Sequence, residues 1–116
     1  KSDEKWNSAN LLFREGQYSD CISRAYYAMF YAIRALLLIK NIIPKTHKSA
    51  GMLLNQYFVN TGLINPEYNK ILSNARDFRE NGDYDEDYFA TKFDADIILK
   101  DALKFITHIK TILKTH

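Results

Sequence analysis

The chain has 116 residues and a formal net charge of +2 at pH 7, and 47% of its residues are hydrophobic and 26% charged. This length and balance fit one globular domain and exclude a disordered chain. The small net charge also argues against a strongly basic protein that binds nucleic acid without specificity, but it leaves room for a local basic site.

Several classes of protein are disfavoured by what the sequence lacks. Cys21 is the only cysteine, so no internal disulfide can form, and we expect a reducing, cytoplasmic location. No run of roughly 18 apolar residues predicts a membrane span. Zinc-type Cys/His spacing and glycine-rich phosphate loops are missing, so we expect no metal and no cofactor. The acidic residues at 83 and 85–87 are interpreted as a solvated turn rather than a cation site.

Hydrophobic residues at helical spacing predict a first helix over residues 3–14, which Gly16 would end. A second helix is predicted over residues 19–40, with Ser19 or Asp20 as its N-cap and Asn41 as its break. Residues 25–33 of this helix carry no charge. A helix with one solvated side would show polar residues there, so we expect this helix to be covered on most sides, at the centre of a bundle or at a subunit interface.

Three further helices complete the predicted chain. Thr46 would cap a helix over residues 47–60, and Asn65 and Pro66 would open another over residues 66–80, which Asn81 and Gly82 would end. The last helix is predicted over residues 85–114, with a long apolar stripe that begins at Phe89. With short connections and no strand pattern, the sequence predicts an all-α, up-and-down antiparallel bundle of four to five helices, forming a single domain over residues 1–116.

A stripe of basic and phenolic residues marks one face of the second helix. Arg24, Tyr27, Tyr31 and Arg34 are spaced so that all four lie along that face. The guanidinium groups could bind phosphate while the phenol rings stack on a base. Alternatively, the tyrosines pack in the core and the arginines pair with acids.

Two other clusters invite a functional interpretation. Lys45 and His47 lie at a predicted helix start, where basic groups and exposed N–H donors suit an anion, and His47 could exchange protons near neutral pH. Arg76 and Arg79 are one turn apart near a predicted helix end, and Tyr84 follows. The alternatives are an ordinary solvated turn for the first cluster and a favourable helix-dipole interaction for the second.

The segment Ser23–Ala32 resembles the second-helix signature of HEPN domains. Pro44–Lys48, Phe58–Gly62 and Arg79 followed by Asp83-Tyr84 are similar to the same branch of that family, so that the resemblance covers residues 6–113. The resemblance implies an all-α bundle that forms a homodimer with a cleft shared between its subunits. It also implies pairing with a small nucleotidyltransferase protein, often as a toxin–antitoxin module.

Active members of the family that the chain resembles are metal-independent ribonucleases with an arginine, four to six residues, and then a histidine. Arg79 fits the arginine position, but Tyr84 stands where the histidine is expected. A phenol with an ordinary pKa near 10 is a poor base at neutral pH, so the family's mechanism does not carry over directly. His47 could substitute from another helix, and Tyr84 or Tyr88 could accept a nucleotide from the partner enzyme.

The leading hypothesis is a HEPN-family homodimer that binds RNA or a nucleotide and acts with a nucleotidyltransferase. Its candidate catalytic residues are Arg79, Tyr84 and His47. Its candidate phosphate- and ligand-binding residues are Arg34, Arg76, Lys45, Tyr27 and Tyr31. The alternatives are a metal-independent RNA endonuclease with a non-standard site and a purely structural or regulatory dimerisation module.

Overall fold

The computed structural model describes the backbone of residues 1–84 and 89–115 and the side chains of residues 1–82 and 89–115. This part of the chain folds into the helices α1 (Ser2–Arg14), α2 (Tyr18–Leu38), α3 (His47–Leu54), α4 (Pro66–Tyr84) and α5 (Lys92–Lys114). A turn of π-helix, Asn55–Val59, continues α3. The described residues form no strand, so the predicted all-α class is confirmed.

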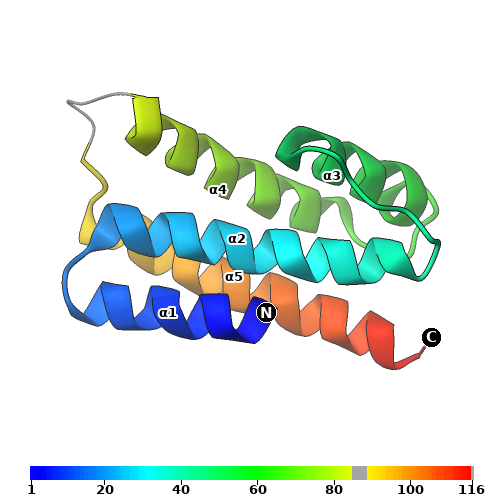
Figure 1. Ribbon diagram of the computed structural model, residues 1–116, viewed down its shortest axis with the longest axis horizontal. Helices are drawn as coiled ribbons and strands as arrows, with labels where there is room; N and C mark the ends of the chain where they lie inside the picture. Colours follow the sequence, from blue (N-terminus) through cyan, green and yellow to red (C-terminus); the bar gives the residue numbers. More distant parts are fainter. Residues whose placement is uncertain (85–88, 116) are drawn as a thin grey trace.

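The four long helices lie along one axis and reverse direction from one to the next, and α3 lies beside the N-terminal half of α4 (Figure 1). Helix α2 occupies the middle and contacts α1, α3, α4 and α5. None of the helices in the described ranges is long and apolar enough to cross a membrane. The arrangement therefore places α2 where residues from α3 and α4 can meet it.

The uncharged run of α2 is covered on most sides, as its composition predicts. Its fully buried residues are Ala25, Tyr26, Ala28, Met29, Ala32 and Ile33. Tyr27, Phe30 and Tyr31 are only half-buried, so they form an aromatic edge that the rest of the chain leaves partly accessible. Contacts within one chain are enough to explain the missing charges.

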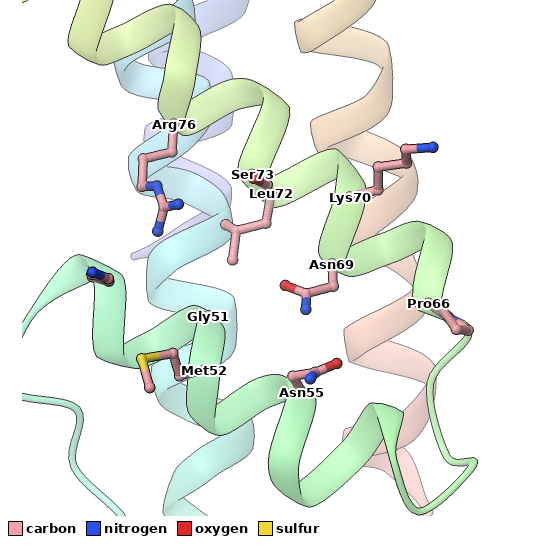
Figure 2. A pocket seen from close by; sticks show the side chains of 10 residues that line it. Gly51, Met52, Asn55, Pro66, Asn69, Lys70, Leu72, Ser73 and Arg76 are labelled. Carbon is pink, nitrogen blue, oxygen red and sulfur yellow. The ribbon is translucent and has the colours of Figure 1, made fainter.

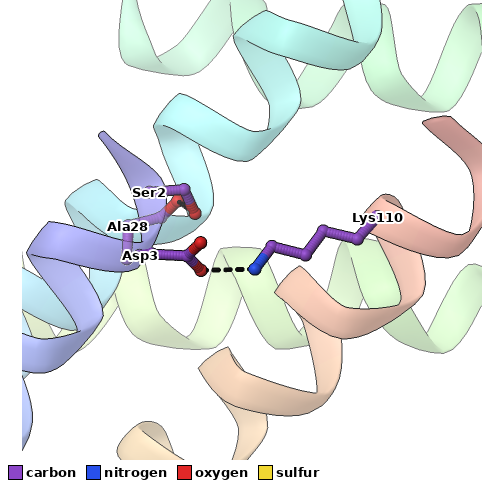
Figure 3. Close-up of polar contacts among 4 residues, drawn as sticks. All are labelled: Ser2, Asp3, Ala28 and Lys110. Atoms are coloured by element: carbon purple, nitrogen blue, oxygen red, sulfur yellow. Dashed lines mark hydrogen bonds and ion pairs between the residues drawn. The ribbon is translucent and has the colours of Figure 1, made fainter. Parts of the chain in front are cut away.

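The N-terminus of α1 is held against two other helices. The Ser2 hydroxyl donates a hydrogen bond to the Ala28 carbonyl oxygen of α2 at 2.8 Å, and Asp3 forms an ion pair with Lys110 of α5 (Figure 3). Across the bundle, the Trp6 indole donates to the Leu99 carbonyl oxygen at 3.0 Å. These contacts orient α1 alongside α2 and α5.

The residues predicted to cap or end helices explain most of the observed helix ends. Gly16 has φ +77° and Asn41 has φ +58°, the left-handed conformation that ends a helix. Thr46 and Ser49 form a reciprocal capping box at the start of α3, with both backbone-to-side-chain bonds at 3.0 Å. Because this box fixes the first turn of α3, it also sets the position of His47.

Some predicted helix ends differ from the structure, and one predicted helix changes its type of hydrogen bonding. Helix α4 continues to Tyr84 rather than ending at residue 80, so Asn81 and Gly82 lie within the helix and do not end it. Helix α2 begins after Gln17, before the proposed caps Ser19 and Asp20. The segment predicted as one helix over residues 47–60 changes from α- to π-type hydrogen bonding at Asn55.

Helix α5 begins at Lys92 rather than at residue 85, because a second capping box sets its start. The Thr91 hydroxyl accepts from the Asp94 amide at 3.0 Å, and the Asp94 carboxylate accepts from the Thr91 amide at 3.3 Å. Phe89 precedes this helix and is 81% exposed, and Phe93 is 72% exposed. The apolar stripe therefore reaches the core only from Ala95 onward.

We predict that Thr91→Ala lowers the free energy of unfolding by about 1 kcal/mol, because the first turn of α5 loses its side-chain acceptor. Thr111→Ala is the matched control: the Thr111 hydroxyl only bonds the Thr107 carbonyl oxygen one turn back on an exposed helix face. That hydrogen bond adds little to the stability of a helix, and alanine has a higher helix propensity than threonine. Urea denaturation followed by circular dichroism measures both, and equal shifts for the two variants would contradict the capping assignment.

Candidate functional site

Arg79 of α4 rests on the aromatic edge of α2. Its Nη2 atom donates a hydrogen bond to the Tyr27 hydroxyl oxygen at 3.0 Å. Its Cζ atom lies 5.1 Å from the centre of the Tyr27 ring and 5.6 Å from that of Tyr26, within the range of cation–π attraction. A hydrogen bond and two ring contacts thus fix the guanidinium against α2.

His47, the first residue of α3, packs on the same aromatic rings. Its ring centre lies 4.3 Å from that of Phe30, 5.2 Å from that of Tyr27 and 5.4 Å from that of Tyr26. Its Nδ1 atom is buried and has no hydrogen-bond partner among the described residues. Burial, and then the positive charge of Arg79, lower the pKa of His47 below its ordinary value. The imidazole is therefore neutral at neutral pH.

We refer to Arg79, Tyr27 and His47 as the Arg79 cluster. Tyr26 lies beneath it and contributes a ring rather than a titrating group, because burial raises its pKa to about 12. Cys21 is also buried, and burial raises the pKa of its thiol to about 11. A neutral imidazole is thus the group of this region best suited to accept a proton near neutral pH.

Two hollows border the Arg79 cluster. One of about 120 Å³ lies beside Arg79 and is lined in part by Asp20 and Ser23 of α2. The other, of about 460 Å³, lies between α1 and α2, and its lining includes Tyr27, Tyr31 and Arg24 as well as the same Asp20 and Ser23. Arg79 therefore borders the first hollow and Tyr27 the second, whereas His47 lines neither.

The proposed stripe on α2 divides into separate parts. Arg34 is exposed and lies over the rings of Phe30 and Tyr31, with its Cζ atom 5.9 and 5.8 Å from their centres. It forms no ion pair with any residue that the structure describes. Tyr27 contacts Arg79, whereas Tyr31 contacts Arg34 one turn further along, and Phe30 links the two parts by touching both His47 and Arg34.

Lys45 and Arg76 are not part of the contacts that form the cluster. Lys45 is exposed in the turn before α3. Arg76 is half-buried and lines a groove between α3 and α4 that has a volume of about 430 Å³ (Figure 2). The side chain of Tyr84 and the whole of Tyr88 lie outside the described residues. Among the described residues, no group of three or more His, Cys, Asp or Glu side chains could hold a metal ion.

Tyr26 and Phe30 were not predicted as part of the site. Both belong to the uncharged run of α2, for which the sequence predicted only that it is covered on most sides. The signal that could have found them is the aromatic spacing itself, since Tyr26 and Phe30 are four residues apart and share a helix face. His47 packs on that pair.

Comparison with known proteins agrees with this architecture. The family model described as HEPN domain matches residues 1–112. The chain belongs to the HEPN family. Its resemblance to HEPN domains, inferred from the Ser23–Ala32 segment, is thereby confirmed.

Three curated relatives match between 65% and 97% of the chain. A protein of Methanocaldococcus jannaschii named "Putative toxin" is 37% identical over 97% of this chain and 84% of its own length. A second M. jannaschii protein with the same description is 29% identical over 97% of this chain and 77% of its own length. A "UPF0332 protein" of Pyrococcus horikoshii is 44% identical over 65% of this chain and 53% of its own length.

Proposed function

We propose that this HEPN chain is the RNA-binding, toxin component of a two-protein module and that the Arg79 cluster holds an RNA phosphate. The observation that carries the proposal is the contact of Arg79 with Tyr27 beside a neutral imidazole. A guanidinium binds phosphate oxygens in a bidentate fork, and a phenol ring offers a base a surface on which to stack. Arg34 and Tyr31 would extend this surface by one helix turn, and Lys45 would add positive charge at the start of α3.

The two-protein module is the second part of this proposal. Its support is family membership together with two relatives that are named as putative toxins. We propose that two copies of the chain share a cleft at the Arg79 cluster and that the partner is a small cytoplasmic nucleotidyltransferase. In this scheme Tyr84 or Tyr88, which follow Arg79 in the sequence, would receive the nucleotide that the partner transfers.

We predict that Arg79→Ala weakens the binding of a single-stranded RNA by roughly 10- to 100-fold, because a charge-assisted contact contributes about 1.5–3 kcal/mol. Tyr27→Phe keeps the ring and removes only the hydroxyl, so its loss should be smaller. Fluorescence anisotropy at fixed ionic strength measures both. Lys114→Ala, which removes an exposed cation at the far end of α5, is the control for total charge. If Arg79→Ala binds RNA as tightly as Lys114→Ala, the cluster is not the RNA site.

A second function, metal-independent RNA cleavage, is favoured by the neutral state of His47. In this reaction the imidazole takes the proton of a ribose 2′-hydroxyl, and the 2′-oxygen attacks the adjacent phosphorus. The bond from phosphorus to the 5′-oxygen breaks, and a water molecule protonates that oxygen, which leaves a 2′,3′-cyclic phosphate and a 5′-hydroxyl. The imidazolium then gives its proton to the resulting hydroxide, which restores the neutral base and the water. Arg79 would stabilise the charge that develops on the phosphoryl oxygens.

We predict that cleavage persists in EDTA and is lost in His47→Gln, while RNA binding changes by no more than about threefold. Because the pKa of His47 is lowered, the base stays neutral in mildly acid solution, and the acid limb of the rate profile should lie below pH 6.5. Gel analysis of end-labelled RNA measures the rate, and RNA with 2′-deoxy substitutions is the uncleavable control. Cleavage that survives in His47→Gln would exclude His47 as the base.

A further inference from the structure

The groove between α3 and α4 is lined by basic side chains and no acidic ones. Lys48 of α3 and Lys70 and Arg76 of α4 line it, and no carboxylate does. None of these three cations forms an ion pair with a described residue. Glu67, at the end of the groove near Pro66, pairs with Lys104 of α5 at 3.5 Å instead. The groove therefore has an uncompensated positive charge, which favours an anionic ligand.

Neutral polar groups lie between these cations. Asn69 projects from α4 towards Asn55 of the opposite helix, and Arg76 extends from α4 towards α3 (Figure 2). An amide side chain both donates and accepts hydrogen bonds, so it matches the edge of a nucleobase. Gly51 faces Leu72 across the groove, and a Cβ atom there would lie 3.5 Å from the Leu72 side chain, an ordinary van der Waals contact.

The groove begins next to the Arg79 cluster. Lys48 follows His47 in α3, and Arg76 precedes Arg79 by one turn in α4. Arg76 is close enough to Tyr26, beneath the cluster, for its charge to act on that phenol. From Arg76 to Pro66 the lining extends along α4 for roughly 15 Å, at 1.5 Å per helical residue. The groove and the Arg79 cluster are thus neighbours along both α3 and α4, because adjacent residues of each helix belong to the two sites.

We propose that this groove binds the single-stranded RNA segment that adjoins the phosphate held at the Arg79 cluster. Lys48, Lys70 and Arg76 contact its phosphates, and Asn55 and Asn69 contact its base edges. Single strands fit this role because their unpaired bases expose the edges that a duplex hides. The inference rests on the proposed RNA-binding function and extends it to a second, separately testable part of the surface.

The test compares a trinucleotide with a longer RNA of about twelve nucleotides, each titrated against the full chain over a range of salt concentrations. Lys70→Ala should weaken the binding of the longer RNA about fivefold. It should also reduce the slope of log K against log salt by about 0.7, which corresponds to the loss of one phosphate contact. Asn69→Ala should weaken the longer RNA with an unchanged slope. Both should leave the trinucleotide unaffected, as should the control Lys114→Ala.

The outcomes separate the two proposals. If Lys70→Ala and Asn69→Ala bind the longer RNA as Lys114→Ala does, while Arg79→Ala weakens both RNAs, the groove inference is wrong and the proposed function stands. If the groove variants weaken the binding of the longer RNA and Arg79→Ala changes the affinity for neither RNA, the groove binds RNA and the cluster does not. An oligoglutamate peptide that competes as well as the longer RNA would overturn the assignment to RNA.

Discussion

The candidate site depends on one interaction, the placement of the Arg79 guanidinium on the tyrosine rings of α2. The hydrogen bond to the Tyr27 hydroxyl fixes its direction, and the two rings hold it from the side. The same rings contact His47, whose pKa is lowered by burial and by the charge of Arg79. Cation and neutral imidazole are therefore coupled through shared neighbours, and a change to one alters the other.

The central position of α2 makes this coupling possible. Its small residues, such as Ala25 and Ala28, are fully buried and let other helices approach, while Tyr27, Phe30 and Tyr31 form a half-exposed edge. Helix α4 brings Arg79 to this edge, and the capping box of α3 brings His47. Because α3 and α4 lie next to each other, their facing residues also form the basic groove. One packing arrangement thus produces both parts of the proposed RNA path.

Local signals in the sequence predicted most of the fold. Gly16, Asn41 and Thr46 end or begin helices as expected, and the absence of charge over residues 25–33 correctly indicated a covered helix. The start of α5 was predicted wrongly because Phe89 and Phe93 have core-like spacing. The Thr91–Asp94 capping pattern was the stronger signal for the start of α5. It provides hydrogen-bond acceptors for backbone N–H groups at the helix start, which hydrophobic residues cannot do.

The site was less predictable because it depends on how separate helices meet. Arg79, His47 and Tyr27 were each selected from the sequence, but no local pattern could place His47 on the α2 rings. The groove was missed for the same reason. Lys48, Met52 and Asn55 share one helix face, as do Asn69, Ser73 and Arg76, but each stripe by itself is typical of a solvated surface. Only the packing of α3 against α4 makes the two stripes face each other.

The central claim, that Arg79 and His47 form one electrostatic unit on α2, is tested most directly by an NMR titration of His47 in the wild-type chain and in Arg79→Met. Methionine keeps much of the packing volume and removes the charge. The account predicts that wild-type His47 titrates below pH 6.5 and that its pKa rises in Arg79→Met, because the burial effect remains and the repulsion from Arg79 is lost. A wild-type pKa at or above 6.5, or one that Arg79→Met leaves unchanged, would contradict it.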